Sequence, residues 1–125
     1  MDVFPLMIRR ELGRFALTAE AKWIGKSLSV MIYGGDVPHV GAVSVAYPSK
    51  SEFRDASIVT MSTLSLPGHK DYVVSGPLAE RLAKALNTPV VVTVGVHIDN
   101  ASPQDLETVV AEIESMVDEL ASALK

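Results

Sequence analysis

The segment that most constrains this chain runs from Val90 to Asn100, beginning as the most apolar stretch of the sequence and ending in polar side chains. Alternate side chains of a strand share a face, so one face here is entirely β-branched and apolar: Val90, Val92, Val94, Val96 and Ile98. The other face becomes polar toward its end, where His97 and Asp99 should project together above the gap left by Gly95. We therefore predict a central strand that is covered on both sides and has a binding site at its polar end.

The composition is that of a globular chain whose charge is unevenly distributed. Its 125 residues suit one domain, 1–125, and 48% of them are hydrophobic, which is enough for a full core. The net charge is −4, and the acidic surplus lies in the segment 101–125, where six acids are balanced by Lys125 alone. This distribution disfavours non-specific binding to nucleic acid and assigns the acidity to one predicted helix rather than to the predicted site.

Several classes of site and location are excluded by what the sequence lacks. It contains no cysteine, which excludes disulfides, thiolate zinc sites and cysteine nucleophiles. No apolar segment reaches the roughly 18 residues of a membrane-spanning helix, so we expect no membrane partner. The first residues, 1–5, lack the basic start and apolar stretch of a signal peptide, and we expect a cytoplasmic protein.

Hydrophobic periodicity predicts an α+β fold, with an antiparallel sheet of about five to six strands and two helices late in the chain, in the order β-β-β-β-α-β-α. Before Val90, strands are predicted over 15–23, 28–33, 42–47 and 56–66, the first two joined in a hairpin by Gly25 and Lys26. Helices are predicted to start at Gly76-Pro77 and at Ser102. The segment 3–12 is compatible with either an edge strand or a loose arm.

All three histidines have an aspartate close by in the sequence, in the pairs Asp36 and His39, His69 and Asp71, and His97 and Asp99. Each pair follows a glycine-containing segment at the predicted junction of a strand and a loop. Histidine titrates near neutrality and binds metals, and glycine allows the backbone to approach a ligand closely. The three pairs therefore predict either one shared pocket, including a metal site, or three separate loop ends in which the histidines only stabilise neighbouring backbone.

Other chemical patterns are weaker. The serines lie outside any nucleophile elbow, and Gly34-Gly35 is not a phosphate loop because no helix follows it. Lys70 is either a point charge for a phosphate or a solvated lysine in a turn. Four aromatic residues are candidates for stacking on a flat ring, although strand aromatics are usually core: Trp23, Tyr33, Tyr47 and Tyr72.

Three segments taken together, Gly34–Val43, Pro67–Asp71 and Gly95–Asn100, resemble the prenylated-flavin chaperone-like family, which includes the small D subunit of bacterial gallate decarboxylase. The likeness extends from about residue 14 to the last helix, with the motifs in the same order. It implies a non-catalytic accessory protein that binds prenylated FMN and delivers or protects it for a UbiD-type aromatic-acid decarboxylase. A further likeness to proteasome assembly chaperones implies a homodimer.

The resemblance also implies a cofactor pocket and partners. The implied cofactor-binding residues are Gly35, Asp36, His39, His69, Lys70, Asp71, His97 and Asp99. The implied partners are a UbiD-type decarboxylase subunit or a flavin prenyltransferase. The alternatives are a small metal-dependent enzyme that uses the three His–Asp pairs and a protein-assembly chaperone without a cofactor.

Overall fold

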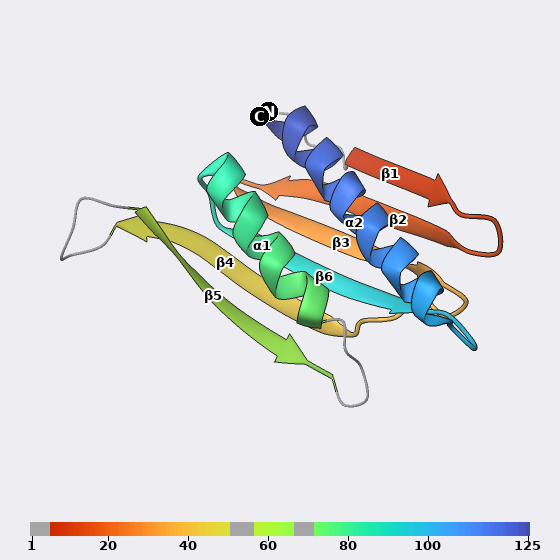
Figure 1. Cartoon of the computed structure of the whole chain (residues 1–125). Coiled ribbons are helices and arrows are strands. Elements are labelled where there is room, and N and C mark those ends of the chain that lie inside the picture. The colour runs from red at the N-terminus through yellow and green to blue at the C-terminus, as the bar shows by residue number, and fades with distance from the viewer. Residues whose placement is uncertain (1–5, 51–56, 67–71) are drawn as a thin grey trace.

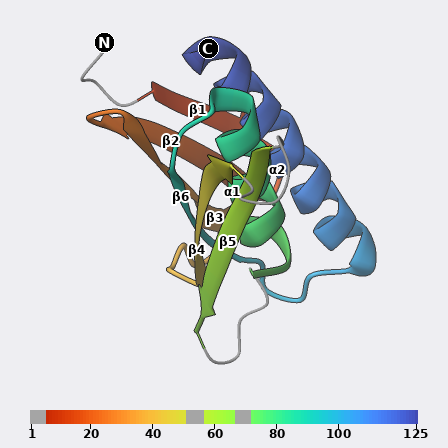
Figure 2. The same cartoon turned by 90° about the vertical axis from the view of Figure 1, so that its left-hand side faces the viewer.

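The computed structural model describes residues 6–50, 57–66 and 72–125. Its elements, in chain order, are β1 (Leu6–Glu11), β2 (Ala16–Ile24), β3 (Ser27–Gly35), β4 (Ala42–Lys50), β5 (Ser57–Ser65), α1 (Tyr72–Leu86), β6 (Val90–His97) and α2 (Pro103–Leu124). The strands form one six-stranded sheet in the order β1-β2-β3-β6-β4-β5. Both helices lie on the same face of this sheet, side by side (Figures 1 and 2). The predicted α+β class, with two helices late in the chain, is confirmed.

The position of β6 in the middle of the sheet determines the arrangement of the rest. β6 pairs in parallel with β3 and antiparallel with β4, and all other neighbouring strands are antiparallel, so the sheet is mixed. The parallel pair arises because α1 carries the chain from the edge strand β5 across β4 before β6 enters. β6 therefore separates two strands that are consecutive in the sequence. The connection from β3 to β4 has to cross the end of β6.

The core lies between the sheet and the two helices. The even-numbered face of β6 forms its centre, as predicted, with Val90, Val92 and Val94 buried. The small residues on one face of β4 let α1 approach closely, and the Ser44 and Ser75 hydroxyls hydrogen-bond at 2.8 Å across this contact. α2 covers the β1–β2–β3 half of the sheet with its buried stripe, Val109, Ile113, Met116, Val117 and Leu120.

The opposite face of the sheet is not covered by any element of the described chain, so the prediction that β6 is covered on both sides is wrong. Val91 and Thr93 point to this open face and are only half-buried. The apolar run misled the prediction because such runs are typical of strands buried on both faces, and no sequence pattern shows on which face the helices pack.

Two further expectations about the chain are settled by the structure. The segment that includes Leu6–Glu11 forms an edge strand paired with β2, rather than a loose arm. α1 begins at Tyr72, so the predicted start at Gly76-Pro77 is wrong and Pro77 lies inside the helix. Proline is best tolerated in the first turn of a helix, which is why the sequence favoured the later start.

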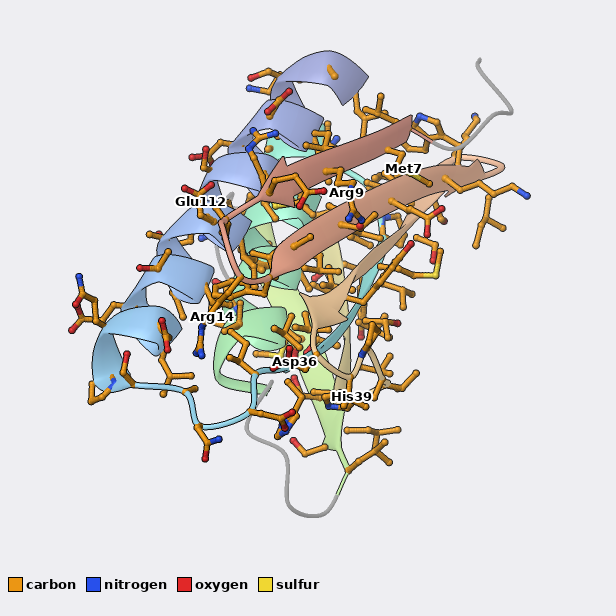
Figure 3. The ribbon with its side chains drawn as sticks, turned by 90° about the vertical axis from the view of Figure 1, so that its right-hand side faces the viewer. Met7, Arg9, Arg14, Asp36, His39 and Glu112 are labelled. Carbon is orange, nitrogen blue, oxygen red and sulfur yellow. The ribbon has the colours of Figure 1, made fainter. Side chains whose placement is uncertain are left out.

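The N-terminus of α2 is fixed by a capping box and an ion pair. The Ser102 hydroxyl accepts a hydrogen bond from the Asp105 N–H, and the Asp105 carboxylate accepts one from the Ser102 N–H, both at 3.0 Å. Arg14 reaches the same carboxylate at 2.6 Å from the β1–β2 connection (Figure 3). These interactions, chiefly the Ser102 N–H donor, lower the pKa of Asp105 below 3.8.

This lowered pKa predicts an acid-sensitive contribution to stability. Because the pKa of Asp105 in the folded chain lies below 3.8, the carboxylate stabilises the fold fully above that pH and loses its effect as the pH falls through the folded value. Urea unfolding of wild type and Asp105→Asn should therefore differ most near neutrality and converge in acid. A difference between the two proteins that stays constant from pH 7 to pH 2 would contradict this assignment.

Candidate functional site

The β3–β4 connection, residues 36–41, crosses the open face directly above β6, and glycines make the crossing possible. A Cβ on Gly95 would overlap the carbonyl oxygen of His39, and a Cβ on Gly35 would overlap that of His97. Two backbone hydrogen bonds tie the connection to β6 on either side of Gly95. The Asp36 N–H donates to the His97 carbonyl oxygen at 2.7 Å, and the Gly41 N–H donates to the Val94 carbonyl oxygen at 3.0 Å. The gap predicted at Gly95 is therefore filled by backbone from another part of the chain.

Two of the three sequence motifs meet at this crossing. The Asp36 carboxylate accepts a hydrogen bond of 2.8 Å from the Asp99 N–H, and the His97 Nε2 lies 3.0 Å from the Asp99 Oδ1. His97 and Asp99 thus lie together, as their spacing predicted, and Asp36 joins them from the other segment. All three side chains are exposed. The pairing orients the imidazole and ties the end of β6 to the start of the connection.

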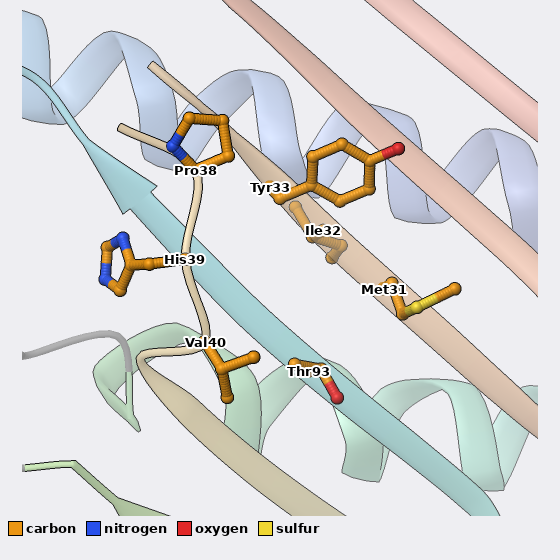
Figure 4. Close-up of a pocket in the computed structure, with 7 residues that line it drawn as sticks. All are labelled: Met31, Ile32, Tyr33, Pro38, His39, Val40 and Thr93. Atoms are coloured by element: carbon orange, nitrogen blue, oxygen red, sulfur yellow. The ribbon is translucent and has the colours of Figure 1, made fainter. Parts of the chain in front are cut away.

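A shallow hollow of about 230 Å³ lies next to this network on the open face. Its walls come from three neighbouring segments: Met31, Ile32 and Tyr33 of β3, Thr93 of β6, and Pro38, His39 and Val40 of the connection (Figure 4). Most of these side chains are apolar, and one is aromatic. A flat, largely apolar ring is the type of ligand that such walls fit best.

The side chains of Tyr33 and Glu20 supply the polar edge of the hollow. The Tyr33 hydroxyl donates a hydrogen bond of 2.7 Å to the Glu20 carboxylate on β2. This bond, together with burial and the nearby negative charge, raises the pKa of Tyr33 above 10.0. The phenol therefore stays protonated at neutral pH, and its ring is held in place by the carboxylate.

The imidazole of His39 does not face Tyr33 across the hollow. Its Nδ1 lies 2.9 Å from the Val37 carbonyl oxygen, and the ring lies on the opposite side of the connection from Tyr33 (Figure 4). Asp36 and His39 lie at the same end of the sheet (Figure 3). His39 therefore contributes backbone and packing to the hollow, while its ring helps to shape the connection.

The third motif cannot be placed. His69, Lys70 and Asp71 lie outside the described residues, as does the side chain of Tyr72. Within residues 6–50, 57–66 and 72–125, no three His, Cys, Asp or Glu side chains gather as a metal site would require. The structure therefore brings together the motifs around Asp36 and His97 and leaves the motif around His69 as a prediction.

Sequence reasoning missed most of the hollow. Met31, Thr93 and Val40 carry no chemical signature, and they meet only because β6 is inserted between β3 and β4. Two wall residues had a signal: His39, as a member of a His–Asp pair, and Tyr33, as an aromatic candidate for stacking next to the Gly34-Gly35 pair.

The fold has a counterpart among solved structures. It resembles the crystal structure of a chaperone complex for yeast 20S proteasome assembly, with a TM-score of 0.62 and 17% sequence identity over 98% of each chain. At this identity the likeness concerns the fold alone. No curated protein matches the sequence.

The sequence itself identifies the family. Residues 11–125 match the model of the prenylated flavin chaperone LpdD-like domain, so the chain belongs to that family. The resemblance found in the three motifs is thereby confirmed. Because the family is one of chaperones, its role is accessory rather than catalytic.

Among the described helices, none is both long and apolar enough to cross a bilayer.

Proposed function

We propose that this protein binds prenylated FMN and protects or delivers it to a UbiD-type aromatic-acid decarboxylase, acting in the cytoplasm. The observation that carries the proposal is the apolar hollow beside the Asp36, His97 and Asp99 network, in a chain of the prenylated flavin chaperone family. Two of the three segments that carry the resemblance, Gly34–Val43 and Gly95–Asn100, supply this network, which supports the proposal. The flavin prenyltransferase that makes the cofactor is the other proposed partner.

The walls of the hollow suit the ring system of a prenylated flavin. Tyr33 offers an aromatic surface, Met31 is an adaptable apolar contact, and Pro38 and Val40 form the opposite wall. Thr93 provides one small polar group at the floor. When bound, the flavin supplies the electron-accepting chemistry of the decarboxylase; the role of this chain is to hold the ring against an apolar surface and away from water.

The phosphate of the cofactor requires a cation that the described part of the hollow does not provide. The acidic groups around the hollow are the Glu20 carboxylate bonded to Tyr33 at its edge and the Asp36 and Asp99 carboxylates of the network beside it, and all three repel a phosphate. We therefore assign the ring to the hollow and the phosphate to Lys70 and His69 of the third motif. Gly35 and His39 complete the proposed site by shaping the connection beside the hollow, and Asp71 is assigned to the site with Lys70 and His69.

The direct test is binding of the reduced cofactor without oxygen. Wild-type protein mixed anaerobically with reduced prenylated FMN should co-elute with it in gel filtration and should slow its oxidation when air is admitted. It should also raise the rate at which an apo-decarboxylase becomes active. Unmodified FMN is the matched ligand control, because it lacks only the prenyl-derived ring.

The outcomes separate the candidate functions. Co-elution with the prenylated flavin and slower oxidation support the proposal, and transfer to the apo-enzyme supports the delivery role. Failure to retain either flavin at any concentration, with the protein folded, would contradict the proposal. Stoichiometric zinc, iron or manganese in protein purified without a tag would instead favour the metal-dependent enzyme.

A further inference from the structure

The edge strand β5 ends the sheet and has no neighbour on its outer side among the described strands (Figure 1). It pairs with β4 alone, over nine residue pairs in unbroken register. Such an edge presents a row of main-chain N–H and C=O groups to any other extended chain. Native proteins usually guard it with charged side chains, proline, a bulge or a very short strand.

The two edges of this sheet differ in how they are guarded. β1, at the opposite edge, is six residues long and carries three charged side chains, Arg9, Arg10 and Glu11. β5 is nine residues long and consists only of Ser, Thr, Val, Ile, Met and Leu, so it has no charge, proline or glycine. β1 therefore has the features that prevent strand addition, and β5 lacks them.

The pairing with β4 shows which main-chain groups of β5 point outward. The Leu66 N–H donates to the Gly41 carbonyl oxygen at 2.9 Å, and hydrogen-bonded pairs alternate along an antiparallel ladder. Every second residue before Leu66 therefore bonds to β4, and the residues between direct their N–H and C=O groups away from it: Ser57, Val59, Met61, Thr63 and Ser65. Pro48, which has no N–H to donate, lies opposite Val59, in agreement with this assignment.

Apolar side chains flank these outward groups on both faces of the sheet. The Ser44 hydroxyl bonds to Thr63 of β5 and to Ser75 of α1, so odd-numbered residues of β5 point to the helix side. Met61 is 39% exposed on that side, and Leu64 is 79% exposed on the open face. An added strand could pair its own apolar side chains with both. The edge therefore fits an uncharged, extended segment rather than a charged or helical one.

We propose that the edge of β5 accepts an extended segment of the decarboxylase that receives the cofactor, as a seventh strand of the sheet. The identity of this partner rests on the proposed function. The position of the edge supports it, because Gly41, bonded to the end of β5, directly follows Val40 in the wall of the hollow. An added strand lies three strand spacings from β6, or ~14 Å at about 4.8 Å each. The recipient is thus held close to the bound ring.

Amide hydrogen exchange, resolved residue by residue by mass spectrometry, tests the proposal. In the chain alone, the amides of Thr60 and Ser62 should exchange slowly, whereas those of Met61 and Thr63 should exchange almost as fast as in an unstructured chain. Addition of the apo-decarboxylase should slow Met61 and Thr63 at least about tenfold. If these two amides already exchange slowly in the chain alone, at any concentration, the chain itself or a second copy occupies the edge and the proposal is wrong.

Two substitutions at Met61 isolate the outward N–H. Met61→Pro removes it, at a position where an edge strand tolerates proline. Met61→Ala is the matched control, because it removes the same side chain and keeps the N–H. Met61→Pro should weaken binding of the apo-decarboxylase at least about tenfold and slow cofactor transfer, whereas Met61→Ala should stay within a few-fold of wild type. Both should retain reduced prenylated FMN, since Met61 lies outside the hollow.

A charge on the edge is a second test that does not depend on the folding of Met61→Pro. Met61→Lys supplies the guard that β5 lacks and should weaken binding of the apo-decarboxylase as Met61→Pro does. Met7→Lys places the same charge on the other edge strand, at a site 57% exposed, and should bind as wild type does. Urea unfolding shows whether each variant is folded.

The readouts distinguish the docking site from the proposed function. If the apo-decarboxylase does not bind wild type, binds Met61→Pro and Met61→Lys as tightly as wild type, or leaves the β5 amides in fast exchange, the docking site is wrong. Retention of the flavin by the same samples then decides the proposed function separately. If the apo-decarboxylase protects the β5 amides but no flavin is retained, the docking site stands and the proposed function fails.

Discussion

Gly95→Val is expected to destabilise the protein by more than ~3 kcal/mol and to abolish retention of the flavin. The side chain would overlap the His39 carbonyl oxygen, and the backbone atoms on both sides are held by hydrogen bonds from Asp36 and Gly41. To make room, the connection has to rise from β6 and lose those bonds, each worth about 1 kcal/mol. This displacement of the connection would also remove the wall of the hollow that Pro38 and Val40 form. Urea unfolding and anaerobic gel filtration measure the two effects.

Gly25→Val is the matched control for this change. Gly25 has a φ of 61° in the β2–β3 turn, and a Cβ there would meet no atom within 4 Å. The control therefore adds only backbone strain, of the order of 1–2 kcal/mol, and should leave flavin binding unchanged. Valine favours strands, so β6 itself would not be weakened by the substitution at Gly95. Equal unfolding midpoints for wild type and Gly95→Val would show that the connection does not rest on β6.

Tyr33→Ala is expected to weaken binding of reduced prenylated FMN about tenfold to a hundredfold, because a buried aromatic contact is worth ~1–3 kcal/mol. The Tyr33 ring is the only aromatic wall among the residues that line the hollow, and Glu20 fixes its position. An anaerobic titration followed by flavin fluorescence gives the affinity. Circular dichroism and the unfolding midpoint show whether the variant remains folded.

Tyr33→Phe separates the ring from the hydroxyl. It keeps the aromatic wall and removes only the hydrogen bond to Glu20, so its affinity should stay within a few-fold of wild type. If both variants bind as tightly as wild type, the flavin ring does not lie against Tyr33. If both lose binding equally, the Glu20 contact rather than the ring carries the effect.

The parts of the fold governed by local chemistry were predictable from the sequence. Alternation identified the buried face of β6, Gly25 and Lys26 identified a hairpin, and Ser102 identified the start of α2. Placement of β6 between β3 and β4 was not predictable, because it depends on pairing between segments 44 to 62 residues apart rather than on any local pattern. The face left uncovered by the helices was missed for the same reason.

The candidate site likewise has one part that the sequence predicted and another that depends on the tertiary fold. The contact between His97 and Asp99 follows from their spacing along one strand, and the structure contains it. The approach of Asp36 to Asp99 and the passage of His39 over Gly95 depend on the crossing connection, which only the tertiary fold creates. The hollow lies where these long-range contacts meet, so most of its walls have no local signature.

The measurement that tests the central claim most directly is amide chemical-shift mapping of the isotope-labelled protein, titrated anaerobically with reduced prenylated FMN. If the flavin ring lies on the open face, the largest shifts should fall on Met31 to Val40 and on Thr93 to His97. The outward face of α2, represented by Leu106 and Val110, should not respond. Shifts confined to α2, or no shifts at saturating flavin, would contradict the account.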